Sequence, residues 1–407
     1  MKDFNHIISV CKETSSITSA VVDEFLLYYA ANKYNLITEM DRKFAAYRHI
    51  TKEFTKEWEN RLKAQYIAHK IFRNKGLINK MLNHSALKRF NNKEMEFLKF
   101  QAENPWRFSF STIIESPNKD FYLMADVFRD EEFLLYSPGV TTTLESEPAI
   151  MWFNMTAFNG SCWQTYGPIS WYRSFEPDDI FFFAVELNPN IEDDDDLLLT
   201  VENNPVPFMM LLSGVNYPLV FSKKDLTVQT MAEYDMENID TRKLSADFKK
   251  EYNDGVYRLA LKRWSGPPHF SQAFYDENKK TIILSAMTDR GFNALVDVLN
   301  KYGYEFSSDP FIRVKPSMII TASEILKKKI ELSEYDHLFT KESSPEKKEE
   351  LARLSKLMDL VMTDINAGCQ PDVETYAKKT GVDPETARGI IDHVLDRFKK
   401  MDKGNKK

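Results

Sequence analysis

The chain has 407 residues, of which 43% are hydrophobic and 28% are charged, and its formal net charge at pH 7 is −7. This balance is typical of a folded globular protein and excludes an intrinsically disordered chain. Because the chain is too long for one ordinary hydrophobic core, its length predicts two to four domains.

The apolar runs, the N-terminus and the cysteines of the sequence all favour a cytoplasmic protein. The longest clean apolar run, Ile180 to Val185, is far shorter than the ~18 residues that cross a bilayer, so we expect no membrane association. The N-terminus lacks the apolar region of a secretory signal peptide. Cys11, Cys162 and Cys369 are odd in number and far apart in the sequence, which argues against a disulfide framework and a zinc cluster. The sequence therefore predicts a cytoplasmic protein without a metal or a cofactor.

Residues 1–103 are predicted to form a helical domain with a basic surface. Ala64, Ile67, Ala68 and Ile71 have the spacing of one apolar helix stripe. Residues 60–93 carry nine Lys or Arg and no Asp or Glu, although the whole chain is acidic. Such segregation favours an anionic partner, either a nucleic acid or an acidic protein.

The candidate contacts in this domain are six cations and one aromatic residue: Lys63, Tyr66, Lys70, Arg73, Lys80, Lys88 and Arg89. The cations can neutralise phosphates, and Tyr66 can stack on a base. Two alternatives remain open: the basic face is simply solvated, or it docks within the chain on the acidic run Glu192 to Asp196. We expect that run to be an exposed loop, because consecutive carboxylates diverge and cannot converge on a metal ion.

Residues 104–190 are predicted to form an aromatic-rich β domain. Trp106, Phe108 and Phe110 alternate with polar residues, which is the period of a strand. Two hairpins are expected, one around the polar turn 129–132 and one around Asn159-Gly160, whose residues tolerate positive φ. Residues 180–187 are predicted to form a last strand. About six short strands favour an antiparallel sheet or a small barrel.

The aromatic rings of such a barrel allow two interpretations. Rings on its surface can stack single-stranded nucleic acid, as in OB-folds. However, a small sheet needs bulky side chains to build its core, so packing explains most of these rings.

The run Asp126 to Leu135, with the sequence Asp-Val-Phe-Arg-Asp-Glu-Glu-Phe-Leu-Leu, resembles a strand–turn–strand of uncharacterised bacterial proteins that often end in a SEC-C zinc motif. The resemblance covers only part of the middle of the chain and implies a bacterial protein. This chain lacks the cysteines of that motif, so the resemblance implies no zinc.

Residues 191–339 are predicted to be an α+β segment packed on the β domain. A strand is expected at 281–287, a helix capped by Thr288 follows it, and a further strand at 312–314 completes a strand–helix–strand unit.

Residues 340–407 are predicted to be a C-terminal trihelical unit that follows a polar linker at 340–348. Within it, Val373 to Leu395 resembles a generic helix-turn-helix, in which Gly381 makes the turn and Asp383-Pro384 begins the second helix. The resemblance implies DNA contact by three cations, which are Lys378, Lys379 and Arg388. Because Glu385 opposes the phosphates at the same helix end, a protein-contact role is the alternative that we favour.

Together these features predict an α+β multidomain protein with a helical N-terminal domain, an aromatic-rich antiparallel β-sheet or small barrel with an α+β extension, and a C-terminal three-helix unit. The leading functional hypothesis is a binding protein whose basic surface contacts nucleic acid or an acidic partner. A structural or protein-interaction role is the alternative. An enzyme comes third, because no phosphate-binding glycine loop, nucleophile elbow or zinc-protease motif is present. The sequence nominates no catalytic residue and no oligomeric state.

Overall fold

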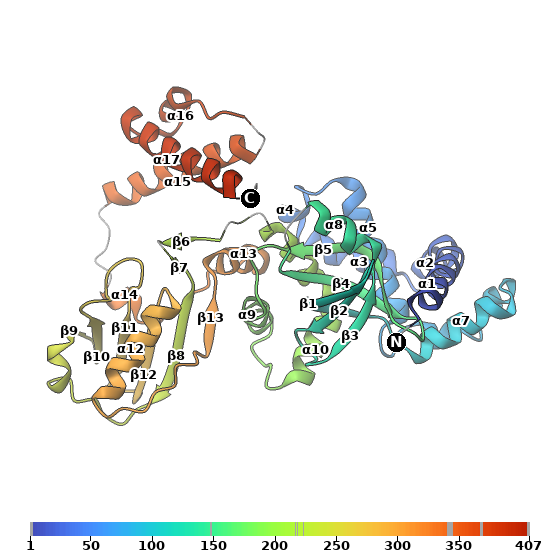
Figure 1. The fold of residues 1–407 in the computed structure, drawn as a ribbon, viewed down its shortest axis with the longest axis horizontal. Coiled ribbons are helices and arrows are strands. Elements are labelled where there is room, and N and C mark those ends of the chain that lie inside the picture. Colours follow the sequence, from blue (N-terminus) through green and yellow to red (C-terminus); the bar gives the residue numbers. More distant parts are fainter. Residues whose placement is uncertain are drawn as a thin grey trace. The chain divides into compact units, whose positions relative to one another are not determined.

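The structure, a computed structural model, describes residues 3–146, 149–215, 217, 219–222, 224–339, 345–366 and 369–404 (Figure 1). The chain divides into two compact units, Met1–Tyr335 and Asp336–Lys407. The first unit contains a helical region, a closed barrel and an open sheet, and the second contains helices. The α+β multidomain class is therefore confirmed. Of the expected linker at 340–348, residues 340–344 lie outside the described residues, and the remainder belongs to the helix α15 (Pro345–Asn366).

The N-terminal region is helical, as predicted. Its elements are α1 (Phe4–Thr18), the π-helix η1 (Ser19–Leu26), α2 (Leu27–Lys33), α3 (Leu36–Ala45), α4 (Arg48–Thr51), α5 (Lys56–Phe72), α6 (Ile78–Met81), the 3-10 helix η2 (Ser85–Arg89) and α7 (Asn92–Glu103). Thr55 caps α5 by accepting a hydrogen bond from the Trp58 amide. Ile67 and Ile71 of α5 are buried, and so is Tyr66 on the opposite side, so α5 is a central helix with neighbours on both faces.

The aromatic region closes into a five-stranded barrel. Its strands are β1 (Arg107–Asn118), β2 (Phe121–Asp126), β3 (Glu132–Tyr136), β4 (Met151–Phe158) and β5 (Trp163–Tyr172), joined in the order β1-β2-β3-β5-β4. Both predicted hairpins are confirmed, β2 with β3 and β4 with β5, and Gly160 has a φ of +90° in the second turn. The β3–β5 pair is parallel, and α8 (Pro138–Ser146) lies between β3 and β4 in the chain. This connectivity is the topology of an OB-fold barrel.

The prediction of a strand at 180–187 is wrong, because these residues belong to α9 (Pro177–Leu187). Pro177 occupies the first turn, and Glu176 and Asp179 form a capping box, which together start a helix. Ile180 and Phe183 are fully buried, while Phe182 is nearly so. A helix that is buried over most of its circumference has no polar face, and its sequence therefore resembles that of a buried strand.

The acidic run is not the loop that we expected. Asp193 is the N-cap of α10 (Asp194–Asn203), and its carboxylate accepts a hydrogen bond from the Asp196 amide at 2.9 Å. Asp194, Asp195 and Asp196 fill the first turn, where carboxylates stabilise the positive end of the helix dipole. The short helices α11 (Pro205–Met210) and η3 (Leu211–Gly214) follow.

The rest of the first unit is built on a six-stranded antiparallel sheet with the order β13-β8-β12-β11-β10-β9 (Figure 1). Its strands are β8 (Gln229–Asp235), β9 (Phe248–Asn253), β10 (Val256–Leu261), β11 (Gln272–Asp276), β12 (Thr281–Ala286) and β13 (Ile312–Val314). The predicted strand–helix–strand unit is present: Thr288 caps α12 (Asp289–Lys301), and the apolar face of α12 packs on the sheet. The remaining elements are β6 (Phe221–Ser222), β7 (Asp225–Leu226), η4 (Lys243–Ala246), α13 (Pro316–Leu326) and, at the start of the second unit, α14 (Asp336–Phe339).

The second unit also holds α15 (Pro345–Asn366), α16 (Val373–Thr380) and α17 (Pro384–Gly404). Leu357 and Val361 of α15 pack against Tyr376, Ala387 and neighbouring apolar side chains of α16 and α17. Gly381 ends α16 with a φ of +72°, in the left-handed region that suits glycine. The turn therefore has the geometry expected from the sequence.

Candidate functional site

The cations predicted on α5 are engaged within the chain. Lys63 lies 2.9 Å from Glu59 and 3.4 Å from Asp41, and Lys70 lies 2.8 Å from Glu39. Burial acts to raise the pKa of Glu39, but the hydrogen bonds from Lys70 and Tyr66 outweigh it and the pKa is lowered. Most of the positive charge of this helix is therefore balanced by acidic residues of the same unit.

Tyr66 and Arg73 are also turned inward. Tyr66 is only 1% exposed, and its hydroxyl donates to Glu39 at 2.8 Å, so the ring offers no face to a nucleic-acid base. Arg73 donates to the backbone oxygen of Glu202 and to the Asn203 side chain, both at 3.3 Å. Docking within the chain thus describes α5 better than a solvated or an anion-binding face does. Its partners, however, are Glu39, Asp41 and Glu59 in the helical region and the end of α10, not the acidic run itself.

The other predicted contact residues are exposed. In the first unit these are Lys80, Lys88 and Arg89, and Arg89 lies 4.5 Å from the centre of the Phe25 ring. In the second unit they are Lys378, Lys379 and Arg388. Within the described part of the chain, none of these six cations has an acidic partner within ion-pair distance. They remain available to an anion, but in two separate groups.

The barrel face formed by β2 and β3, on which OB-folds bind their ligands, is covered by the protein's own α1. Phe4, Ile7 and Cys11 of α1 pack with Phe121 and Leu134 of the barrel. The Phe4 and Phe121 rings are 4.8 Å apart. Nucleic acid therefore cannot stack on this face while α1 is in place.

Two cysteines that are distant in the sequence meet where α1 reaches the β4–β5 turn. Cys11 Sγ and Cys162 Sγ are 3.4 Å apart, which is a hydrogen-bond contact and not a disulfide, and both residues are buried. Asn159 Nδ2 donates to Cys11 Sγ at 3.3 Å. The hydrogen bond with Cys162 lowers the pKa of Cys11, against the opposing effect of burial. This contact fixes α1 beside β5.

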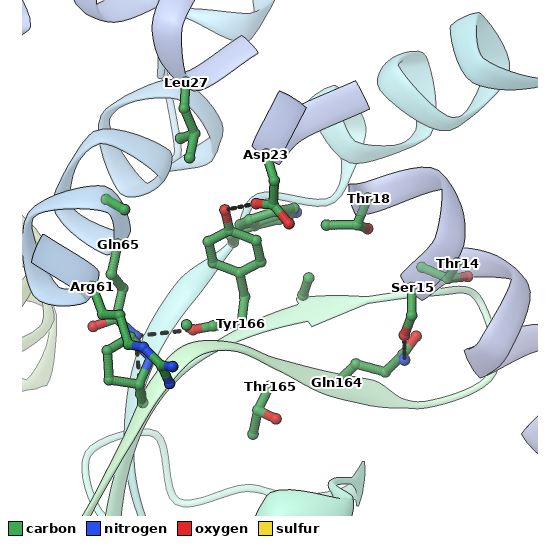
Figure 2. Close-up of a pocket in the computed structure, with 15 residues that line it drawn as sticks. Thr14, Ser15, Thr18, Asp23, Leu27, Arg61, Gln65, Gln164, Thr165 and Tyr166 are labelled. Carbon is green, nitrogen blue, oxygen red and sulfur yellow. Dashed lines mark hydrogen bonds between the residues drawn. The ribbon is translucent and has the colours of Figure 1, made fainter. Parts of the chain in front are cut away.

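A groove of about 500 Å³ opens next to this contact, between the N-terminal helices and β5 (Figure 2). One wall is a row of hydroxyl groups on α1, from Thr14, Ser15 and Thr18, which faces Gln164 and Thr165 of β5. Gln164 Nε2 donates to Ser15 Oγ at 3.2 Å and to the Cys11 backbone oxygen at 3.1 Å. The polar wall is therefore held in place by the barrel.

Asp23, in the π-helix η1, supplies the carboxylate of the groove. Tyr166 of β5 donates to Asp23 Oδ1 at 2.5 Å, as Figure 2 shows. Desolvation at this wall raises the pKa of Asp23, the hydrogen bond from Tyr166 opposes it, and the charge of Glu24 adds to the increase. Burial and the bond to Asp23 raise the pKa of Tyr166, so Tyr166 remains a hydrogen-bond donor. π-Helical turns occur often at functional sites.

The remaining wall comes from α5 and the floor from the barrel. Gln65 Nε2 donates to the backbone oxygens of Tyr166 and Pro168, at 2.9 and 3.2 Å. Gly167 allows this approach, because its φ is +76° and a Cβ there would lie 3.1 Å from Gln65 Nε2. Arg61, which pairs with Glu57, and Trp106 also line the groove.

These groove residues were not predicted from the sequence. The run Thr14-Ser15-Ser16-Ile17-Thr18 carried one usable signal, since hydroxyl residues are poor helix formers and rarely fill a helix without a reason. No pattern in the sequence connects this run to Tyr166.

Comparison of the chain with protein-family models, with curated proteins and with solved structures gives no match. Within the described residues, no three His, Cys, Asp or Glu side chains come together as a possible metal site. No described helix is long and apolar enough to span a membrane.

Proposed function

We propose that this is a binding protein that holds a neutral, hydroxyl-rich small molecule, of the saccharide class, in the groove between α1 and β5. The observation that carries the proposal is the arrangement of hydroxyl groups on α1 beside the Asp23 carboxylate. Hydroxyl and carboxylate groups can together accept and donate hydrogen bonds to a polyol. OB-fold barrels are known to bind oligosaccharides as well as oligonucleotides.

The charges of the groove support a neutral ligand over a phosphate. Asp23 repels an anion, and the guanidinium of Arg61 is already engaged, since Arg61 Nη2 lies 2.6 Å from Glu57 Oε1. Binding is favoured over catalysis, because the hydroxyl that meets a carboxylate in the groove, that of Tyr166, has a pKa raised by burial and by its bond to Asp23, so it stays protonated and is not activated as a nucleophile. A cytoplasmic location is part of this proposal, in keeping with Cys11 Sγ and Cys162 Sγ lying 3.4 Å apart without a disulfide bond between them.

The proposal is tested by calorimetric titration of the full chain with glucose, maltotriose and chitotriose. We expect Asp23→Asn to weaken binding of the preferred sugar by about tenfold or more, because a hydrogen bond to a charged group contributes about 1.5–3 kcal/mol. Asn keeps the size of the side chain and an oxygen that can accept from Tyr166.

The sugar affinity measured in this titration should depend on pH. Affinity should fall as the pH drops towards the pKa of Asp23, and the fall should begin above the pH at which an ordinary aspartate is protonated. The control is Lys80→Ala, at an exposed position outside the groove. Equal affinity in the wild type and Asp23→Asn, or no heat from any of the three sugars, would remove the groove from the function.

A second candidate function, nucleic-acid contact, is favoured by the two groups of exposed cations. Lys80, Lys88 and Arg89 form the first group, and Lys378, Lys379 and Arg388 the second. Each supplies only three charges, so the salt-dependent part of the affinity is small. An acidic protein partner would use the same groups.

Fluorescence-anisotropy titrations with a single-stranded and a duplex oligonucleotide at two salt concentrations test this candidate. Changing either group to Ala should reduce the magnitude of the slope of log K against log salt by up to about 2 units for single strands and about 3 units for duplexes that contact all three cations. Binding that is unchanged in both triple variants would exclude these cations as the contact surface.

A further inference from the structure

The contact between Cys11 of α1 and Cys162 of the β4–β5 turn brings two sulfur atoms almost within bonding distance. Cys11 Sγ and Cys162 Sγ lie 3.4 Å apart, and both residues are buried. A disulfide bond is about 2.05 Å long, so the two sulfurs need to approach by roughly 1.4 Å to form one. Atomic displacements of about 1 Å are ordinary in folded proteins, so the pair is placed for oxidation.

The neighbouring groups favour the thiolate, which is the reactive form of a cysteine. Asn159 Nδ2 donates to Cys11 Sγ at 3.3 Å and to Cys162 Sγ at 3.7 Å. The hydrogen bond with Cys162 lowers the pKa of Cys11, burial opposes it, and the bond from Asn159 adds to the decrease. Cys11 is therefore the sulfur that we expect to react first with an oxidant.

Burial protects a cysteine from oxidants, but the cover over this pair is a single helix that buries few side chains. Of the fifteen residues of α1, Ile7 and Cys11 are buried. Cys162 directly follows the exposed residues Gly160 and Ser161. Segments with few buried contacts open at a lower free energy than the whole domain unfolds. A small oxidant can therefore reach the sulfurs when α1 opens locally.

We propose that Cys11 and Cys162 form a reversible oxidation site, at which hydrogen peroxide converts the thiol pair into a disulfide that locks α1 onto the barrel. The Cys11 thiolate attacks one peroxide oxygen, the O–O bond breaks, and the displaced hydroxide takes up a proton and leaves as water. The Cys162 sulfur then attacks the sulfur of the resulting sulfenic acid, which forms the S–S bond and releases a second water. The two electrons and two protons lost by the thiols go to the peroxide, and a dithiol reductant restores them.

The disulfide would act on α1 as a whole. Without it, the packing of Phe4, Ile7 and Cys11 on the barrel is non-covalent, and α1 can open and uncover the face formed by β2 and β3. With it, two residues that are 151 positions apart in the chain are joined, and α1 cannot leave that face. This lock does not require the groove beside α1 to bind any ligand.

Intact-mass measurement tests the oxidation. The full chain carries Cys369→Ser, because the exposed thiol of Cys369 could join two chains. After treatment with hydrogen peroxide and denaturation in N-ethylmaleimide, we expect the chain to lose the mass of two hydrogen atoms and to take up no maleimide. After reduction with dithiothreitol it should take up one maleimide at each of the two cysteines. Full labelling after peroxide treatment, or a gain of oxygen in place of the loss of hydrogen, would overturn the proposal.

Limited trypsin digestion of the same chain tests the lock. Lys12 is exposed and directly follows Cys11, and trypsin cleaves there when α1 opens. Oxidation should slow this cleavage by about tenfold or more, because the disulfide removes the openings in which α1 leaves the barrel. Cleavage after the exposed Lys80 should keep its rate, and peroxide-treated Cys162→Ala should be cut after Lys12 as fast as the reduced chain. If the disulfide forms and Lys12 is still cut at the reduced rate, the bond does not lock α1.

Discussion

Replacing Lys315 by Met is expected to lower the free energy of unfolding of the first unit by about 3–5 kcal/mol, because it leaves a buried carboxylate without its cation. Lys315 is 3% exposed and Asp179 is 1% exposed. Lys315 Nζ lies 2.9 Å from Asp179 and 2.8 Å from Glu176, and the Lys315 amide donates to Asp179 at 2.8 Å. The pair joins α9 beside the barrel to the start of α13.

The loss should depend on pH. Burial raises the pKa of Asp179, and Lys315 holds that increase back. Without Lys315 the pKa must rise further. A carboxyl group whose pKa is raised on folding favours the folded state below its unfolded pKa, near 4, and loses this contribution as the pH rises through its folded pKa. The deficit of Lys315→Met should therefore be smaller at pH 5 than at pH 8.

Urea unfolding followed by near-ultraviolet circular dichroism at these two pH values measures the effect. Lys315→Met combined with Asp179→Asn should recover part of the loss, because the charge is removed while one acceptor oxygen remains. Lys80→Met is the matched control at an exposed lysine. A loss below about 1 kcal/mol for Lys315→Met at pH 8 would mean that water reaches Asp179 in solution.

The features that the sequence predicted correctly are those set by neighbouring residues. Asn159-Gly160 specifies a tight turn regardless of what packs on it, and Thr288 and Gly381 cap helices through backbone conformation and local hydrogen bonds. The alternation of Trp106, Phe108 and Phe110 likewise marks β1, since one side of that strand packs on helices. Local rules were sufficient for these elements.

The features that the sequence did not predict depend on distant partners. In the sequence, Lys70 and Arg73 belong to a basic face. In the folded chain Glu39 lies beside Lys70, and the backbone oxygen of Glu202 accepts a hydrogen bond from Arg73. Cys11 and Cys162 are 151 residues apart in the chain, and only α1 crossing the barrel brings them together. The same crossing creates the groove, so its hydroxyl wall and Tyr166 could not be connected from sequence spacing.

Replacing Trp106 by Ala should cost about 3–5 kcal/mol of unfolding free energy, because it removes a large buried side chain at the junction of helix and barrel. Trp106 is 1% exposed, its ring stacks 4.2 Å from that of Phe72 on α5, and it lies 4.7 Å from that of Tyr166. Its Nε1 donates to Gln101 at 2.6 Å.

A second variant separates the contribution of the Trp106 hydrogen bond to stability from that of its ring. Trp106→Phe keeps most of the contact with Phe72 but leaves the buried oxygen of Gln101 without a donor, so we expect a smaller loss of about 1–2 kcal/mol. Thermal and urea unfolding of both variants measure the difference. Equal losses would show that the hydrogen bond to Gln101, and not the ring, decides the stability of this junction.

The Trp106 variants also bear on the groove, because this ring lines it and packs against Tyr166, the partner of Asp23. In Trp106→Ala, Tyr166 loses the packing that fixes its ring, so the hydroxyl that holds the Asp23 carboxylate becomes less well positioned. Sugar affinity measured on the folded fraction should therefore fall in Trp106→Ala and change little in Trp106→Phe. If Trp106→Ala binds as tightly as the wild type, Tyr166 and Asp23 keep their positions without the Trp106 ring, and this ring does not support the groove.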